Sequence, residues 1–220
     1  MVEILVPVSR TMTPGPARFQ IREANPEDVH GMCETFAEGT RIAFTALPEG
    51  ERWAPRLADD VATRYLTIYA KGIDDSRLPD SSIRMFVAKS EDGTVVGYLN
   101  YKHLDDGTGQ LFGWHVRKQY HGTGLAHHLM DVVRRCSGTR DIISRTTEGT
   151  RAVGAHRKAG FVEDVSIPLD DPRRGPPTRW RQHGCPEFYT DAHGNPITDE
   201  TGAKIRVGRQ IPLILRYRAS

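Results

Sequence analysis

A glycine-rich turn between an expected strand and an expected amphipathic helix constrains this chain more than any other segment. It reads Val116-Arg117-Lys118-Gln119-Tyr120-His121-Gly122-Thr123-Gly124-Leu125-Ala126. The first turn of a helix leaves backbone N–H groups unpaired, and their partial positive charge favours anions. Glycine lets the backbone approach a diphosphate closely and adopt conformations that a Cβ atom would forbid. Two adjacent cations add positive charge, so the segment predicts a phosphate-binding turn; the alternative is a tight turn with a helix cap.

Two widespread phosphate-binding motifs do not fit this turn. A dinucleotide-binding Gly-x-Gly-x-x-Gly pattern needs a further glycine at position 127, where the chain has His127. The strands before the turn are expected to form hairpins rather than a parallel βαβ unit. A P-loop is excluded as well, because no Gly-Lys-Ser/Thr sequence follows.

The hydrophobic pattern predicts an α/β fold of the α+β type around a largely antiparallel sheet. Period-two alternation predicts strands, and apolar residues at helical spacing predict helices. The expected strands are 18–23, 83–88, 95–101, 110–116, 141–146, 161–167 and 211–217, with a short edge strand over 4–8. The expected helices are 26–37, 56–70, 125–136 and 150–158. No internal repeat is evident.

Length and composition suit one soluble domain with additions. The chain has 220 residues and a formal net charge of +2, which is too balanced for a nucleic-acid footprint over the whole protein. We expect an N-terminal extension over 1–17 and one domain over 18–220, with an excursion over 170–210 before the last strand. Without an 18-residue apolar run or a signal peptide, the expected location is the cytoplasm, with no membrane partner.

Cysteine and histidine spacing argues against a metal site or a disulfide framework. The three cysteines are odd in number and widely spaced, at Cys33, Cys136 and Cys185. His127 and His128 are adjacent on a helix and point in different directions, so they cannot share an ion as an i, i+4 pair can. No carboxylate completes an HExxH pattern, and we expect no metal.

Two segments together resemble the GNAT acyltransferase superfamily. Gln119-Tyr120-His121-Gly122-Thr123-Gly124 is similar to the family's acyl-CoA-binding motif Gln/Arg-x-x-Gly-x-Gly/Ala. Residues 149–161 resemble its Asn-x-x-Ala-x-x-x-Tyr-x-Lys-x-Gly-Phe segment, with matches at Ala152, Lys158, Gly160 and Phe161. Gly149 replaces the Asn and His156 replaces the Tyr. The motifs stand in the family's order, and the resemblance covers about 18–167 plus the last strand.

The resemblance implies a GNAT fold, in which a mixed, mostly antiparallel sheet is splayed at the acyl-CoA site and flanked by helices. By position, the gap would lie between 110–116 and 141–146. The cofactor-binding residues that the resemblance implies are Trp114, His115 and Val116 for the pantetheine arm, and Gly122, Thr123 and Gly124 for the pyrophosphate, with Gln119 and His121 beside them. Leu125, Ala126, Gly149, Ala152 and Lys158 complete this expected set.

The implied reaction is direct attack of an acceptor amine on the thioester of acetyl-CoA, without an acyl-enzyme. It needs a base, N–H donors for the oxyanion and a proton for the departing CoA thiolate. We expect His156 to face the CoA sulfur as proton donor; the alternative is a histidine on the helix surface. The position of a glutamate base in some members is Ser144, which is no base. His115 is therefore the expected base, with other candidates at His103, Asp105, Asp106, Glu34 and Glu38.

The expected function is acetyl-CoA-dependent N-acetylation of a primary amine, favoured on a small molecule, with a homodimer kept open. One alternative is a macromolecule acetyltransferase that uses the basic run from Arg173 to Arg181 on a protein or an aminoacyl-tRNA. Another is an acyl-CoA-binding regulatory protein without turnover. Acceptor contacts are expected over 41–56, whose sequence does not reveal the acceptor.

Overall fold

A single mixed sheet organises the molecule. The computed structural model describes residues 4–7, 18–78, 80–138, 140–166, 180, 182–199 and 202–216. Within these, eight strands lie in the order β1-β2-β3-β4-β5-β6-β8-β7. The strands are β1 (Ile4–Pro7), β2 (Arg18–Glu23), β3 (Ile83–Lys89), β4 (Val95–His103), β5 (Gly109–Val116), β6 (Ile142–Thr147), β7 (Val162–Glu163) and β8 (Gln210–Leu215). The helices are η1 (Pro26–Asp28), α1 (Val29–Thr45), α2 (Gly50–Ser76), η2 (Lys118–Tyr120), α3 (Leu125–Ser137) and α4 (Arg151–Lys158).

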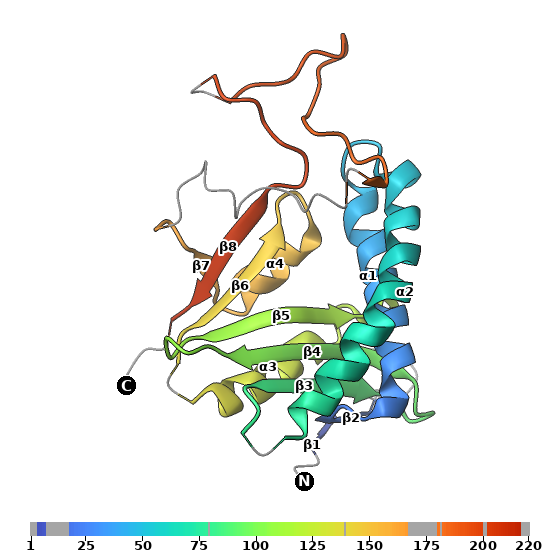
Figure 1. Cartoon of the computed structure of the whole chain (residues 1–220), viewed down its shortest axis with the longest axis vertical. Coiled ribbons are helices and arrows are strands. Elements are labelled where there is room, and N and C mark those ends of the chain that lie inside the picture. Colours follow the sequence, from blue (N-terminus) through green and yellow to red (C-terminus); the bar gives the residue numbers. More distant parts are fainter. Residues whose placement is uncertain are drawn as a thin grey trace.

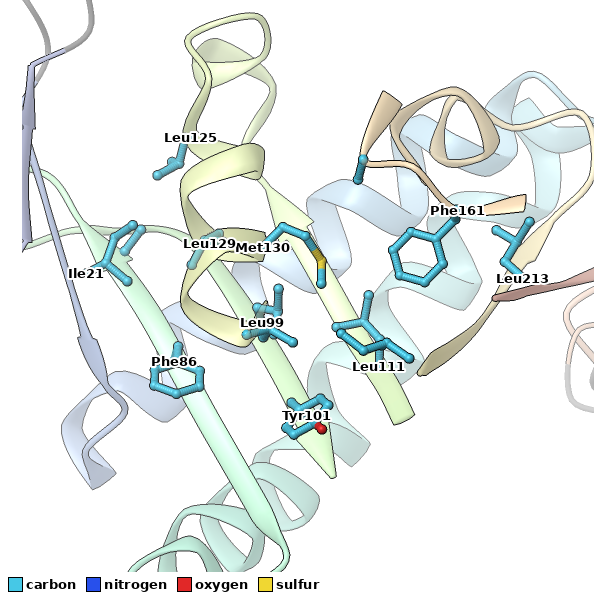
Figure 2. Packing of buried hydrophobic residues seen from close by; sticks show 14 of the residues in the cluster. Ile21, Phe86, Leu99, Tyr101, Leu111, Leu125, Leu129, Met130, Phe161 and Leu213 are labelled. Carbon is cyan, nitrogen blue, oxygen red and sulfur yellow. The ribbon is translucent and has the colours of Figure 1, made fainter. Parts of the chain in front are cut away.

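Helices cover the sheet on both faces (Figure 1). On one face α1 and α2 bury Met32, Tyr69 and Ile73 with Met85 and Tyr98 of the strands. On the other face α3 buries Leu125, Leu129 and Met130 over Phe86, Leu99 and Leu111, beside Phe161 and Leu213 (Figure 2). Tyr98 and Leu99 therefore serve opposite cores, because successive side chains of a strand point to opposite faces.

The sheet is splayed where β5 meets β6, as the resemblance implied. This pair is parallel and holds only two register positions, Gly109 with Ile142 and Gln110 with Ile143. Beyond them the two strands diverge (Figure 1). The register between β4 and β5 shifts at Asn100, which leaves Phe112 as an extra residue. A bulge bends its strand, so this shift accounts for the departure of β5 from β6.

The first two helices are longer than predicted. The pattern predicted ends near 37 and 70 and a second start near 56, whereas α1 reaches Thr45 and α2 spans Gly50–Ser76. Pro55 lies inside α2, and because proline usually marks a helix boundary, the pattern did not predict the first turns of this helix. Phe44, Leu47 and Trp53 at this junction pack against Trp180 and Val207, which a local pattern does not show.

The strand predicted over 161–167 is too long. The structure has only Val162–Glu163 as β7, because Asp164 then accepts hydrogen bonds from the N–H and hydroxyl of Ser166 and turns the chain. The edge strand predicted over 4–8 is confirmed as β1, which pairs with β2. The other residues of the 1–17 extension, and the run 173–179 of the basic segment, lie outside the described residues.

The excursion before β8 contains a repeat that the sequence reading missed. Thr-Asp-x-x-Gly-x-x-Ile occurs over 190–197 and again over 198–205, with φ of 83° at Gly194 and 82° at Gly202. The N–H of Ile197 donates to Tyr189, Ile205 donates to Ile197, and Tyr189 donates to Ile205, at 2.8, 2.9 and 3.0 Å. Three chain segments thus close a ring of backbone hydrogen bonds. The expectation of no repeat is wrong because an eight-residue period built on turn residues carries no helical or strand pattern.

Among the described residues, no helix combines the length and the apolar character that crossing a membrane would require.

Candidate active site

The gap between β5 and β6 leaves one edge of β5 open. Trp114, His115 and Val116 pair with β4 through Leu99, Tyr98 and Gly97, and within the described residues they have no register partner on β6. Backbone groups on this edge are therefore available to an extended ligand, which would lie beside them as an added strand lies beside a sheet edge. This is the place where the sequence predicted the pantetheine arm.

The glycine turn has the geometry of an anion site. Gly122 and Gly124 have φ of 79° and 87°, in the left-handed region that favours glycine, and Gly124 is the N-cap of α3. Within the described residues, the backbone N–H groups of Gly122, Gly124 and Ala126 have no hydrogen-bond acceptor. Unpaired N–H groups at a helix start attract anions.

Two side chains expected beside the pyrophosphate brace the turn instead. The His121 Nε2 donates to the Val116 carbonyl at 2.8 Å, and the Thr123 hydroxyl donates to the Tyr120 carbonyl at 2.7 Å. Gln119 is exposed on η2, Leu125 is buried in the core under α3, and Ala126 is half-buried. The groups of this turn that stay unbonded within the described residues are therefore mainly backbone N–H groups.

Only part of the expected positive charge remains free. Arg117 pairs with Glu34 at 2.7 Å and donates to the Thr35 hydroxyl at 3.2 Å, so a carboxylate offsets its charge. Lys118 lines a cavity of about 250 Å³ with Gly149 and Arg151. Because Lys118 follows β5 and the other two follow β6, this cavity lies at the open end of the gap. Two cations thus stand where phosphate groups would enter.

The second motif places its members at different distances from the gap. Gly149 has φ of 77°, and an added Cβ would stand 3.4 Å from Leu47, which explains a glycine here. The Ala152 carbonyl accepts a hydrogen bond from His156 Nδ1 at 2.8 Å. Lys158 is exposed at the far end of α4, about 10 Å along the helix from Arg151 at the cavity.

His156 is buried rather than on the helix surface, which overturns the alternative reading. A carbonyl oxygen only accepts, so the bond to Ala152 assigns the proton of the neutral imidazole to Nδ1. Nε2 then accepts from the Ser144 hydroxyl at 2.9 Å. Burial lowers the pKa of His156, opposed by the bond to Ala152, and Trp114 and Phe161 meet its ring edge-on.

His115 lies on the opposite face of the gap, toward α1 and α2. Its ring stacks on Tyr98 and contacts Phe36, with centroids 5.2 and 4.7 Å away. Burial, with a smaller contribution from His156, lowers the pKa of His115 to about 4. The side-chain amide of Asn100, fully buried on the same face, has no hydrogen-bond partner among the described residues. A neutral imidazole and an unpaired amide therefore stand on the side from which an acceptor could approach.

The other base candidates are engaged or distant. Glu34 pairs with Arg117, and Glu38 accepts the Lys118 backbone N–H at 2.7 Å. His103 pairs across the sheet with Gly109, at the end of β5 away from the glycine turn. Asp105 and Asp106 lie in the hairpin at that same far end, where Asp106 accepts from Thr108.

Sequence reasoning dismissed one residue that the structure places in the site. Ser144 is no base by its residue type, yet it is buried and bonded to His156. The signal was available in the alternation of β6, which puts Ile142, Ser144 and Thr146 on the core face, toward α4. At position 156 a histidine replaces the longer tyrosine of the family motif, and the shorter side chain leaves room for a hydrogen-bond partner on β6.

Comparisons with known proteins agree with this architecture. The model of the acetyltransferase (GNAT) family matches residues 38–161, more than half of the chain. An aminoglycoside N(6')-acetyltransferase type 1 from Stenotrophomonas maltophilia is 34% identical over 102 residues, which cover 41% of this chain and 67% of that protein. The chain therefore belongs to the GNAT family of acetyltransferases. Members of this family use acetyl-CoA as co-substrate, and the chain is an N-acetyltransferase.

Solved structures share the fold at low sequence identity. The PaiA N-acetyltransferase from Thermoplasma acidophilum, in complex with coenzyme A, has a TM-score of 0.58 and 15% identity, over 66% of this chain and 91% of that one. A GNAT-family acetyltransferase from Staphylococcus aureus Mu50 has a TM-score of 0.53 and 14% identity, over 90% and 99%.

Proposed function

We propose that this chain transfers the acetyl group of acetyl-CoA to a primary amine of a small molecule by direct attack. The observation that carries the proposal is the pair of imidazoles on opposite faces of the splayed gap. His115 faces α1 and α2, while His156 comes from α4. A thioester in the gap would have one imidazole on the side of the attacking amine and the other on the side of the leaving sulfur.

On the donor side, the open edge of β5 binds the pantetheine arm and the glycine turn binds the pyrophosphate. The unpaired N–H groups of Gly122 and Gly124 carry the anion contacts, with Lys118 and Arg151 at the mouth. His156 lies on the sulfur side, behind the Ser144 hydroxyl. Because Nε2 accepts from that hydroxyl and carries no proton of its own, the hydroxyl is the group that can turn to donate a hydrogen bond to the departing thiolate.

On the acceptor side, His115 takes the proton that the amine loses as the new bond forms. Its low pKa leaves the imidazole unprotonated near neutral pH, as a base must be. The buried Asn100 amide offers a polar partner on the same face. Because the base is weak, the acceptor must already be a neutral amine when it attacks.

An aminoglycoside amine is the first acceptor to test, because the S. maltophilia relative is named as an aminoglycoside acetyltransferase. The packing of the excursion supports a small acceptor. The α1–α2 junction is packed against Trp180, Cys185 and Val207 of the excursion, and Tyr189 lies near Gly149. The excursion therefore covers this side of the gap. Transfer to a macromolecule and acyl-CoA binding without turnover are the competing functions.

The deciding experiment is release of CoA from acetyl-CoA with a panel of amines, including aminoglycosides, a peptide with a free N-terminus and an aminoacyl-tRNA. We expect the rate of CoA release to rise when a small amine is added. CoA alone should raise the melting temperature, because a ligand that binds only the native state stabilises it. A CoA-dependent shift without release by any amine would favour the binding protein, and release by the peptide or tRNA alone would favour the macromolecule enzyme.

A further inference from the structure

Ser144, His156 and Ala152 form a chain of hydrogen bonds in which the proton positions are assigned. The Ala152 carbonyl accepts from Nδ1 at 2.8 Å, and Nε2 accepts from the Ser144 hydroxyl at 2.9 Å. A nucleophile within hydrogen-bond reach of a base, with that base oriented by a third group, is the arrangement of serine nucleophiles. Here the backbone carbonyl takes the orienting role.

The position of Ser144 brings this arrangement to the gap. Ile143 is the last residue of β6 that pairs with β5, so Ser144 is the first one past the point where the strands part. Among the described residues, the Ser144 hydroxyl bonds to His156. The hydroxyl donates in this bond, so its oxygen lone pairs remain for a ligand. Both side chains are buried, so the dyad is held by the core between β6 and α4.

An unpaired donor lies beside the dyad. The indole Nε1 of Trp114 is buried and has no hydrogen-bond partner among the described residues. Its ring meets His156 edge-on, with centroids 5.1 Å apart. An N–H group in this place is available to a carbonyl oxygen on which negative charge develops.

We propose that Ser144 is an acyl-accepting nucleophile, and that the chain hydrolyses acetyl-CoA through an acetyl-serine when no amine is bound. This second activity rests on the proposed function only in that acetyl-CoA occupies the gap. Burial lowers the pKa of His156, which keeps the imidazole neutral and able to accept the hydroxyl proton.

The steps balance without a further co-reactant. Ser144 Oγ bonds to the acetyl carbon while its proton passes to His156 Nε2. The carbon–sulfur bond breaks, and the thiolate takes that proton to leave as CoA thiol. Water then attacks the ester and gives a proton to Nε2, and Ser144 Oγ departs and takes this proton back. The products are acetate and CoA.

The sequence around Ser144 makes the intermediate easy to locate. Trypsin cuts after Arg140 and Arg145 and releases the peptide Asp-Ile-Ile-Ser-Arg, residues 141–145. Its single hydroxyl belongs to Ser144, and it contains no lysine or cysteine. An acetyl group in this peptide after acid quenching of the full-length protein with acetyl-CoA therefore reports acetyl-Ser144.

The experiment measures CoA release without amine and the acetylation of this peptide in the wild type, Ser144→Ala, His156→Ala and Thr146→Ala. The last variant removes another buried hydroxyl from the same face of β6. We expect acetylated peptide in the wild type and in Thr146→Ala, and amine-independent release about a hundredfold lower in Ser144→Ala and His156→Ala.

Two results would overturn the inference. If CoA raises the melting temperature and amines release CoA, but the peptide stays unacetylated and Ser144→Ala releases CoA at the wild-type rate without amine, Ser144 is no nucleophile. If neither CoA nor acetyl-CoA shifts the melting temperature of the folded protein, the donor site itself fails, and the proposed function falls with it.

Discussion

Gly39 of α1 lies so close to His115 of β5 that an added Cβ atom would stand 2.7 Å from the imidazole Nδ1. Real Cβ atoms do not approach a neighbour this closely, so a side chain at position 39 must displace the imidazole. The absence of a Cβ on one helix thus sets the position of the proposed base on the neighbouring strand.

Gly39→Ala is expected to lower acetylation by about tenfold or more, because an alanine would displace the His115 imidazole from its present position. Gly154→Ala is the matched control, since Gly154 lies within α4 and has nothing within 4 Å of its added Cβ. That control should gain about 0.5–1 kcal/mol of stability from helix propensity. Steady-state rates and melting temperatures of both variants are the measurement. Equal activity in both variants would contradict the role given to this contact.

The titration of His115 is not expected to appear in the pH profile of kcat/KM between pH 5 and 8. Its pKa of about 4 keeps it neutral over that range, so the profile should rise toward alkaline pH as the acceptor amine loses its proton. His115→Gln should lower turnover by about a hundredfold with little change in the CoA-induced melting shift. A wild-type limb near pH 6.5, or an unchanged rate in the variant, would remove His115 as the base.

Gly124→Ala is expected to weaken CoA binding. A residue with a Cβ at φ of 87° costs about 1 kcal/mol, and the relaxed turn would misplace the N–H groups that meet the anion. Gly138→Ala at the other end of α3 is the control, because its φ of 61° also strains a residue with a Cβ atom and an added Cβ would have nothing within 4 Å. Calorimetric titration with CoA separates the two. A loss of affinity in both variants would point to α3 as a whole rather than to the turn.

Asp28→Asn is expected to destabilise the fold by about 3–5 kcal/mol, because it leaves two cations without their buried carboxylate. The Asp28 carboxylate pairs with Arg22 at 2.6 Å and with Lys89 at 3.1 Å, and it accepts the Asn25 backbone N–H at 2.8 Å. Asp59→Asn, which breaks an exposed pair with Arg41, should cost less than about 1 kcal/mol. Urea denaturation at pH 7 compares them, and equal losses would show that burial of Asp28 adds nothing.

The same carboxylate predicts a pH dependence of stability. Burial raises the pKa of Asp28, but the hydrogen bonds from Arg22, Asn25 and Lys89 outweigh it and hold the pKa below the usual 3.8. A lowered native pKa means that the unfolded chain binds more protons as the pH falls. The stabilisation by the ionised Asp28 carboxylate should be complete above pH 4 and should be lost as the pH falls through its native pKa. This loss should occur in the wild type and be absent in Asp28→Asn.

Local patterns in the sequence determined most elements and their order. Alternation predicted β2 over Arg18–Glu23 with its observed bounds and β5 within one residue, and helical spacing predicted α3 within one residue. The periodic pattern of a strand or a helix involves only residues a few positions apart, so these elements can be predicted without knowledge of the fold. The two spaced motifs likewise indicated the family and the gap.

Only the tertiary structure decided which distant residues meet on each side of the gap. The Ser144–His156 bond spans 12 residues, and the Arg117–Glu34 pair, which offsets one expected phosphate-binding charge, spans 83. The extended ends of α1 and α2 likewise depend on Trp180 and Val207, far along the chain. Each of these contacts joins segments that are far apart in the chain, and the hydrophobic periodicity of the sequence does not show which segments come together. The sequence by itself therefore determined the acetyltransferase fold, and tertiary packing decided the hydrogen-bond partners of His156 and the surroundings of His115.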